Sequence, residues 1–490
     1  MSSRRITVDP ITRLEGHGRI EIFLDDAGKV ENVYFQVPEL RGFEKFCEGH
    51  PVEELARITT RICGVCPEAH HMASAKAADA VYHVEVPPAG VKLRRLLYSA
   101  FYVADHTTHF YILSGPDFVV GPDAPPAQRN ILGLIEKVGV EVGKKVIKTR
   151  HDCHEIIKML GGRTVHPVCA LPGGMSKPLF EEERETVAKM ADDAVEFAKF
   201  GFKVFDDIVL SNEGYVSMIQ SDAYAHETYS IGTVDDDNKV DFYDGHLRIT
   251  DQEGEEFARF HPSEYLEHIE ERVEPWTYLK FPYLKKVGWK GLTDGSKSGV
   301  YKATPLSRLN ASDGMATPLA QAEYQRMYDT LGGKPVHATL ATHWARLIEL
   351  MQAAEQLQQL AGDDEITSTD IRAIPTATPD EGVGCVEAPR GTLIHHYKTD
   401  GDGIVKKVNL IVGTTNNNAA ICMSLKKAAQ KVISGAKGQI DRGLLNLVEM
   451  AFRAYDPCLA CATHSLPGDM PMEITVRSST GEVLDKVVRD

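Results

Sequence analysis

Two pairs of cysteines with the same spacing stand near opposite ends of this chain. Cys63 and Cys66 belong to the segment RICGVCPEAH, and Cys458 and Cys461 belong to DPCLACATH. Two CxxC pairs supply four thiolates, which is enough to hold one soft metal centre. If the pairs meet, the chain must fold back on itself so that its two ends close over a buried site.

Length and composition are those of an ordinary globular protein. A chain of 490 residues favours two or three lobes, and 43% hydrophobic and 25% charged residues are typical values. The apolar runs are too short for a membrane span and the N-terminus lacks a signal peptide, so we expect a cytoplasmic protein unless a partner carries it across a membrane. The net charge of −16 argues against nucleic acid as a partner, but not against another protein.

The chain has nine cysteines, of which five lie outside the two pairs. In a reducing compartment the paired cysteines fit metal ligands better than disulfides. The scattered ones are expected to be small, buried apolar residues; they are Cys47, Cys153, Cys169, Cys385 and Cys422.

Residues 1–50 are predicted to be rich in β-strands, because polar and apolar residues alternate on both sides of an Asp-Ala-Gly turn. This segment carries Glu15, in the polar stretch DPITRLEGHG, and Glu44. Without further information, Glu15 is best interpreted as a solvated loop carboxylate.

Residues 51–209 are predicted to form a helical core that contains the first cysteine pair. Helices are expected at 52–62, 67–84, 91–113, 126–160 and 181–209. Cys66 precedes the second of these helices, where the helix dipole favours a thiolate. His70 lies one turn further on, and it either contacts a sulfur or is simply packed. Asp105 interrupts an apolar stripe, so it must be half exposed or paired.

The remaining segments complete a mainly α fold with α+β parts, a large helical bundle with small peripheral sheets. Residues 210–336 are predicted to be a mixed α/β insertion, mostly at the surface. Residues 337–464 are predicted to contain a helix, a sheet of two or three strands, and C-terminal helices that lead to the second cysteine pair. Arg390 stands in a bend of this part, where a structural ion pair is its commonest role. Residues 465–490 form a C-terminal extension with a predicted hairpin.

Three kinds of site can use four thiols. A structural zinc site normally uses pairs a few dozen residues apart, and an iron–sulfur cluster commonly uses tighter spacings. A redox or catalytic transition metal is the third option. It also explains why carboxylates, a histidine and an arginine accompany the same two pairs.

The motifs together resemble the large subunits of nickel-iron hydrogenases. RxCGxCPxxH near the start and DPCxxCxxH near the end are the two signatures of that family. DPITRLEGHGRIEI, RGFE, ADHTTHFY, EAPRG and VGTTNN extend the resemblance over residues 5–464. Details such as HGRI and CATH are similar to the cytoplasmic multi-subunit branch, which includes methyl-viologen-reducing, NAD(P)-linked and sulfhydrogenase-type enzymes.

The resemblance implies that all four thiolates bind nickel. Cys63 and Cys458 would be terminal ligands, and Cys66 and Cys461 would bridge to an iron that carries two cyanides and one carbon monoxide. The implied reaction is the reversible heterolytic cleavage of H₂ into a hydride and a proton, and the proton must pass to a nearby base.

The resemblance also implies roles for the residues around the metals. The proton would pass from the Cys458 thiolate to Glu15, a carboxylate suited to this if burial raises its pKa. Arg390 is always protonated, so it would orient the gas rather than act as the base. Asp105 and Asp456 would pair with Arg390.

A further set of residues would support the metals from a second layer. Thr414 would hydrogen-bond a cyanide, His70 would contact a bridging sulfur, and Pro389 would also line the cofactor. A magnesium ion would be bound by Glu44, the carbonyl of Leu410 and His464, tying the two chain ends together. One departure is Gly413, where many family members have proline.

The family also implies partners. The five scattered cysteines offer no cluster for electron transfer, so a separate iron–sulfur small subunit is required, and further flavin-bearing or heterodisulfide-type subunits are expected beyond it. A maturation endopeptidase would remove residues 465–490 after nickel insertion, cutting between His464 and Ser465.

Two rival interpretations come from other classes of protein. One is the homologous quinone-site subunit of respiratory complex I, but chains of that kind lack the cysteine pairs. The other is a scaffold protein held together by zinc. Metal analysis separates them, since nickel and iron with infrared bands of carbon monoxide and cyanide would exclude zinc alone.

Overall fold

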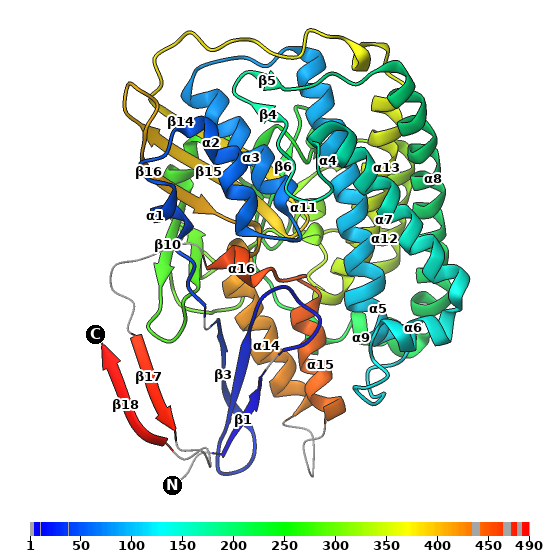
Figure 1. The fold of residues 1–490 in the computed structure, drawn as a ribbon. Coiled ribbons are helices and arrows are strands. Elements are labelled where there is room, and N and C mark those ends of the chain that lie inside the picture. The colour runs from blue at the N-terminus through cyan, green and yellow to red at the C-terminus, as the bar shows by residue number, and fades with distance from the viewer. Residues whose placement is uncertain are drawn as a thin grey trace.

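A computed structural model describes residues 4–9, 11–37, 39–433, 442–463, 472–477 and 483–489. Its helices are α1 Phe43–Cys47, α2 Val52–Ile58, α3 Pro67–Val81, α4 Pro88–Thr108, α5 Gly115–Val119, α6 Ile131–Val138, α7 Val140–Gly161, α8 Glu181–Phe205, α9 Glu213–Ile219, α10 Tyr265–His268, α11 Pro305–Ala311, α12 Pro318–Leu331, α13 Thr342–Ala361, α14 Asn418–Val432, α15 Arg442–Arg453 and α16 Leu459–Ala462. The predicted mainly helical fold with small sheets is confirmed (Figure 1).

The strands form several small sheets. The N-terminal sheet pairs β1 Arg4–Val8, β2 Arg19–Leu24 and β3 Val30–Gln36, and a second antiparallel sheet pairs β14 Glu381–Ala388, β15 Gly391–Thr399 and β16 Val405–Ile411. The largest sheet has the order β13-β7-β6-β8-β9, with β12 beside β6; its strands are β6 Tyr229–Val234, β7 Lys239–Val240, β8 His246–Thr250, β9 Glu256–Phe260, β12 Tyr301–Lys302 and β13 Gly314–Met315. Three two-stranded pairs are β4 Ala170–Leu171 with β5 Gly174–Met175, β10 Ile269–Val273 with β11 Lys280–Leu284, and β17 Met472–Arg477 with β18 Val483–Arg489.

The bundle is built from long helices that pack side by side. Helix α13 lies against α4, α8 and α12, and α7 lies against α4 (Figure 1). The run predicted as one helix over 126–160 is two helices, because Gly139 adopts a φ of 91° between α6 and α7. Among the described residues, no helix is long and apolar enough to cross a membrane.

Helix α3 is held close to the second sheet by small residues. A Cβ at Gly384 of β14 would lie 2.1 Å from the carbonyl oxygen of Ala73, and one at Gly382 would lie 2.4 Å from the amide nitrogen of Val81. Only glycine permits this approach of strand to helix. The packing fixes the start of α3, where Cys66 stands, relative to the bend between β14 and β15.

The N-terminal sheet packs on helices from the other end of the chain. β3 lies beside α14, and the rings of Phe35 and Phe452 meet at 5.1 Å between centroids (Figure 1). This contact between the first and last parts of the fold brings the loop between β1 and β2 to the segment after α15.

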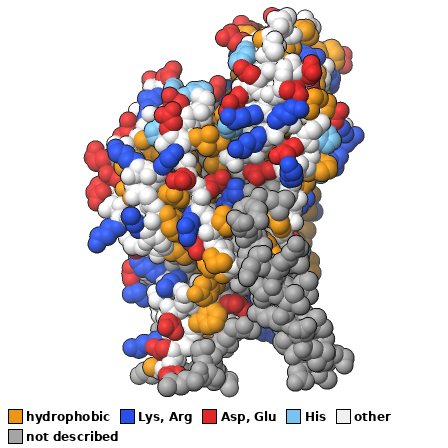
Figure 2. Space-filling view, turned by 90° about the vertical axis from the view of Figure 1, so that its left-hand side faces the viewer, with side chains coloured by type: hydrophobic (Ala, Val, Ile, Leu, Met, Phe, Trp, Pro, Cys, Tyr) orange, Lys and Arg blue, Asp and Glu red, His pale blue; other side chains and the backbone are white. Residues whose placement is uncertain are grey.

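The insertion at 210–336 is less peripheral than the sequence suggested. All six residues of β6 are buried, and Thr233 in this strand donates from its backbone N–H and its hydroxyl to Glu387 of β14, each at 2.8 Å. The sequence predicted that this insertion lies mostly at the surface, but the rest of the molecule covers β6. The outer surface is mixed in charge: on the face in Figure 2, basic and acidic side chains are interspersed with hydrophobic ones.

The C-terminal extension is described only as two strands. β17 and β18 pair antiparallel, as the predicted hairpin requires. The predicted turn at 479–481 and the cleavage point at His464 lie outside the described residues.

Candidate metal centre

The four paired cysteines converge on one buried point. The Sγ atoms of Cys63 and Cys458 are 3.3 Å apart, those of Cys66 and Cys461 are 3.5 Å apart, and those of Cys458 and Cys461 are 2.8 Å apart. All four sulfurs lie within 4.8 Å of one another. This spacing matches thiolates that share a metal centre, because metal–sulfur bonds are about 2.3 Å long.

Short turns and helix starts hold each cysteine in place. Cys63 ends a 3-10 helix at Thr59–Ile62, and its sulfur accepts the backbone N–H groups of Val65 and Cys66 at 3.2 and 3.4 Å. Cys66 and Cys458 occupy the N-cap positions of α3 and α16, although neither side chain accepts a capping hydrogen bond. The two amide donors at Cys63 favour the thiolate form that a metal requires.

The electrostatics of the four sulfurs call for a cation. Burial raises the pKa of the Cys458 and Cys461 thiols well above their usual range, whereas hydrogen bonds from its neighbours, Cys458 first, lower the pKa of Cys63. Several thiolates cannot share so small a buried space without positive charge between them. The donor set, four soft sulfurs, therefore fits nickel and iron.

Glu15 lies directly on this cluster. The Cys458 thiol donates to Glu15 Oε2 at 3.0 Å, and the backbone N–H of Ala460 donates to the same oxygen at 3.0 Å. The Leu459 amide also donates to the Glu15 carbonyl at 3.0 Å. Burial, followed by the charge of Cys63, raises the pKa of Glu15. Glu15 is therefore no ordinary solvated loop carboxylate.

Arg390 stands between two carboxylates from distant segments. Its Nη1 donates to Asp105 Oδ2 and its Nη2 lies beside Asp456 Oδ2, each at 3.0 Å, and all three side chains are buried. Asp456 adopts a left-handed φ of 52°, and burial raises its pKa to about 7, with Arg390 opposing that rise. The aspartate on the helix is thus paired, as the sequence required.

Hydrogen bonds and ion pairs of Arg308 support the bend that carries Arg390. Arg308 is fully buried and donates to the carbonyl oxygens of Ala388 and Pro389 at 3.1 and 3.3 Å. It also pairs with Glu349 at 2.6 Å and with Glu387 at 3.1 Å. This network was not predicted from the sequence. A glutamate inside the apolar run LIELM of α13 was the one signal for it.

Thr414 contacts the second cysteine loop, and His70 contacts another histidine. Thr414 Oγ1 accepts the backbone N–H of Cys458 at 3.0 Å, so it positions the second cysteine loop. His70 Nδ1 lies 3.1 Å from His395 Nε2, and His395 Nδ1 lies 2.6 Å from the Tyr397 hydroxyl. The departure at Gly413 has a steric reason, because a Cβ there would meet the Gly391 carbonyl oxygen at 2.9 Å.

Two of the three expected magnesium ligands are adjacent. The backbone N–H of Leu410 donates to Glu44 Oε1 at 2.8 Å. His464 lies outside the described residues, but the preceding residue, Thr463, accepts the backbone N–H of Arg41 at 2.7 Å. The chain before His464 therefore runs beside the segment that leads to Glu44.

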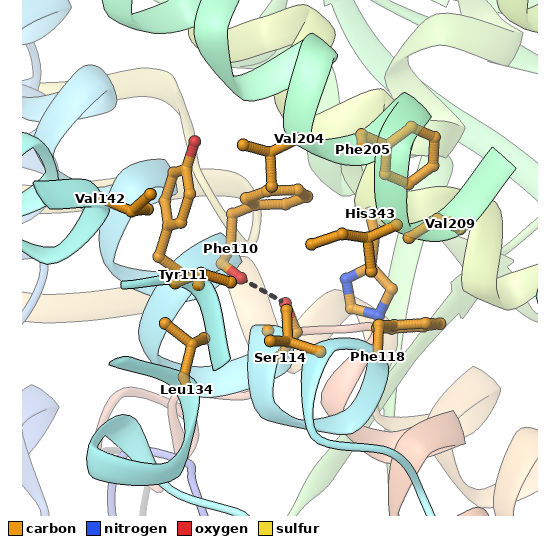
Figure 3. A pocket seen from close by; sticks show the side chains of 14 residues that line it. Phe110, Tyr111, Ser114, Phe118, Leu134, Val142, Val204, Phe205, Val209 and His343 are labelled. Carbon is orange, nitrogen blue, oxygen red and sulfur yellow. Dashed lines mark hydrogen bonds between the residues drawn. The ribbon is translucent and has the colours of Figure 1, made fainter. Parts of the chain in front are cut away.

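An apolar cavity of about 40 Å³ lies in the helical bundle, away from the sulfurs (Figure 3). Aromatic and aliphatic side chains line it, together with His343 and with Ser114, whose hydroxyl donates to the carbonyl of Phe110 at 3.1 Å. None of the site residues expected from the sequence lines this cavity. The chemistry of the molecule is therefore concentrated at the four cysteines.

Comparison with known proteins agrees with this site. A family model described as "Nickel-dependent hydrogenase" matches residues 41–130 and 145–464, and one described as "HoxL-like" matches residues 5–40. The chain is 49% identical over 487 residues to an iron-sulfur subunit of the F420-non-reducing hydrogenase of Archaeoglobus profundus, covering 99% of this chain and 100% of that one. It is 38% identical over 502 residues to the beta subunit of the NAD-reducing hydrogenase HoxS of Cupriavidus necator, covering 99% and 100%.

A solved structure supports the same family assignment. A NAD⁺-reducing [NiFe]-hydrogenase in the H₂-reduced state superposes with a TM-score of 0.88 at 36% identity, covering 95% of this chain and 100% of that one. The chain therefore belongs to the nickel-dependent hydrogenase family. It is a large, catalytic subunit that cleaves H₂ at a nickel-iron centre, and its relatives are subunits of multi-subunit enzymes. The zinc-scaffold interpretation is wrong, and so is the complex I interpretation.

Proposed function

We propose that the proton released from H₂ leaves through Cys458 and Glu15. When bound, nickel and iron supply the soft Lewis-acid and redox chemistry that H₂ cleavage needs. In this proposal Cys63, Cys66, Cys458 and Cys461 would hold nickel, and Cys66 and Cys461 would also hold iron. The observation that carries it is the 3.0 Å contact between Cys458 Sγ and Glu15 Oε2, which gives a proton on the sulfur an immediate acceptor.

Arg390 is proposed to orient the gas beside the sulfurs without taking the proton. Asp105 and Asp456 hold both ends of its guanidinium group, and these ion pairs raise its pKa well above the usual range, against the effect of burial. A guanidinium held in this way is a fixed positive charge. The guanidinium therefore favours the polarisation of H₂ at one fixed position beside the sulfurs.

The iron is proposed to carry two cyanides and one carbon monoxide, with Thr414, His70 and Pro389 around them. Thr414 already accepts from Cys458 N–H, which leaves its hydroxyl proton free to reach a ligand of the iron. Magnesium is proposed at Glu44, the carbonyl of Leu410 and His464, where a hard cation suits oxygen ligands. The contact between Glu44 and Leu410 supports that assignment.

Electrons are proposed to pass first to an iron–sulfur small subunit, then to flavin-bearing or heterodisulfide-type subunits. The nine cysteines of the chain are all buried and none forms a disulfide. Among the described residues, four of them form the one cysteine group that could hold a metal. The names of two relatives, the F420-non-reducing and the NAD-reducing hydrogenases, point to such assemblies. Nine free thiols also fit a reducing compartment, so we propose a cytoplasmic location.

We further propose that a maturation endopeptidase removes residues 465–490 by cutting between His464 and Ser465. Mass spectrometry of the active complex tests this, since an intact tail would contradict it. The function itself is tested on the purified complex by H₂ uptake, metal analysis and infrared spectroscopy. Nickel and iron with cyanide and carbon monoxide bands are expected. The Cys458→Ala variant should lose H₂ uptake while remaining folded, and substantial remaining activity would contradict the ligand assignment.

A further inference from the structure

A polar pocket, distinct from the apolar cavity in the helical bundle, lies where β1, the segment 126–130 and α15 meet. It offers about 620 Å³, and it is lined in part by Arg13, Arg129 and Arg442. Two carboxylates, Asp9 and Glu449, also line it. The pocket is separate from the four cysteines, and no role in H₂ chemistry accounts for its arginines.

Some of these charges are already committed to protein partners. Arg13 pairs with Asp117 and donates to the Leu113 carbonyl at 2.9 Å. Glu449 pairs with Arg453 at 2.8 Å. The exposed Asp9 lies 4.0 Å from a different arginine, on β2. The charges that remain are those of Arg129 and Arg442.

Arg129 is the distinctive member of this pair. Its side chain is 9% exposed, and its Nε donates to the Ala124 carbonyl at 2.7 Å. Within the part of the chain that the structure describes, its two terminal nitrogens have neither a hydrogen bond nor an ion pair. A buried guanidinium is normally paired, because removing its charge from water is costly. Since Arg129 lines the pocket, its free N–H groups open into that space.

Arg442 supplies a second cation at the same pocket. It is exposed at the start of α15, and no described residue forms an ion pair with it. The hydroxyls of Thr7 and Thr12 lie in the same lining. No aromatic side chain is among the described lining residues, so these residues offer no surface on which a nucleobase could stack.

We propose that this pocket binds an oxyanion of the phosphate type, either the free ion or the phosphate group of a small molecule. The planar fork of Arg129 matches two oxygens of such a group, and Arg442 neutralises the remaining charge. The pocket includes Thr12 and Arg13, which lie on the loop that leads to Glu15. A bound anion would therefore contact both this loop and α15.

The binding test uses the purified complex and isothermal titration calorimetry with inorganic phosphate at constant ionic strength. Saturable binding at one site per chain is expected. The Arg129→Gln variant should weaken it roughly tenfold or more, because charge-assisted hydrogen bonds are lost. The matched control is Arg163→Gln, which removes an exposed arginine on another part of the surface and should leave the affinity unchanged. Absence of saturable binding, equal affinity in Arg129→Gln, or the same heat with chloride would each overturn the proposal.

Further measurements distinguish the free phosphate ion from an organic phosphate, and a second variant covers the case in which Arg129→Gln does not fold. Tighter binding of methyl phosphate than of inorganic phosphate would identify an organic phosphate, and the reverse order would identify the free ion. Phosphate should also slow amide hydrogen exchange over residues 11–15 in the wild type, but not in Arg129→Gln. If that variant fails to fold, the exposed Arg442→Gln is expected to weaken binding as well, and an unchanged affinity there would count against the site.

Discussion

The Cys458 thiol donates a hydrogen bond to Glu15 Oε2 at 3.0 Å, although the two residues come from opposite ends of the chain. Their backbones also pair as a short parallel bridge. This double contact means that the loop with the carboxylate and the loop with the metal ligand cannot move independently. A proton on the sulfur therefore has an acceptor whose position is fixed by the backbone as well as by the side chain.

Replacing Glu15 with glutamine should block proton transfer while leaving the metals in place. Glutamine keeps the size of the side chain but cannot accept and release a proton, so exchange between D₂ and water protons should fall by roughly 100-fold or more. Nickel and iron content should remain at the wild-type level. The matched control is Glu39→Gln, a carboxylate paired with His17 near the surface, which should exchange normally. Unaltered exchange in Glu15→Gln would rule out this route.

Arg390→Lys should impair H₂ oxidation even though the positive charge is retained. An ammonium group cannot reach Asp105 and Asp456 at once with the planar geometry of the guanidinium group. We expect kcat to fall by roughly 100-fold, with metal content and the infrared bands little changed. Steady-state H₂ oxidation by the purified complex gives the measurement. A variant with near-normal kcat would mean that Arg390 is only a structural ion pair.

Cys461→Ser should lower the nickel and iron content of the complex and abolish its activity. A serine oxygen is a harder ligand than a thiolate and binds soft metals less well. The matched control is Cys153→Ser, which changes a buried cysteine on α7 outside the cluster. That variant should keep its metals, as measured by elemental analysis. Equal metal loss in both variants would point to misfolding instead of ligand loss.

The sequence predicted the cysteine cluster well, because cysteines at this spacing have few uses other than binding a metal. Its predictions for individual helices were also sound, since α4 carries a clear apolar stripe and Pro67 marks the start of α3. The position of Asp105 on that stripe required it to be half exposed or paired, whereas its pairing with Arg390 came from the family resemblance. These are local signals that need no knowledge of distant contacts.

The sequence could not reveal what depends on contacts across the fold. Arg308 and Glu349 are both fully buried and pair with each other. The apolar run around Glu349 signals its burial but does not identify its partner. Glu387, which is remote in the chain, accepts two hydrogen bonds from Thr233 of the buried strand β6. Such pairs are recognised only when two segments are brought together, because alternation and periodicity report one element at a time.

Gly391→Ala should destabilise the protein and disturb Arg390. Gly391 adopts a φ of 151°, and a Cβ there would lie 2.3 Å from the Gly413 carbonyl oxygen. Because the Gly413 oxygen belongs to the backbone, it cannot move aside easily, and we expect a loss of about 2 kcal/mol or more. Gly401→Ala is the control, since its Cβ would find only Thr378 at 3.7 Å. Thermal unfolding and H₂ oxidation should change in the first variant alone.

The free energy of unfolding should decrease as the pH falls from 7 to 5, because a stabilising contribution of His71 is lost. Its Nδ1–H donates to the Ala56 carbonyl at 2.8 Å, and its Nε2 accepts the amides of Cys169 and Ala170 at 3.2 and 3.0 Å. Burial lowers the pKa of His71 to about 4, below the value of about 6.5 in the unfolded chain. Its stabilising effect is therefore complete above pH 6.5 and is lost as the pH falls toward 4, by about 2 kcal/mol between pH 7 and 5.

The His71→Gln variant isolates this contribution, because other buried histidines titrate in both proteins. His71→Gln should unfold at a lower temperature than the wild type at pH 7, since a glutamine amide does not place its donor and acceptor where the two ring nitrogens lie. The difference between the two midpoints should shrink at pH 5, where protonation of His71 in the unfolded chain already weakens the wild type. His151→Gln, at an exposed position of α7, should shift the midpoint little at either pH. A gap between wild type and His71→Gln that stays constant or widens on acidification would show that His71 does not remain neutral in the folded protein.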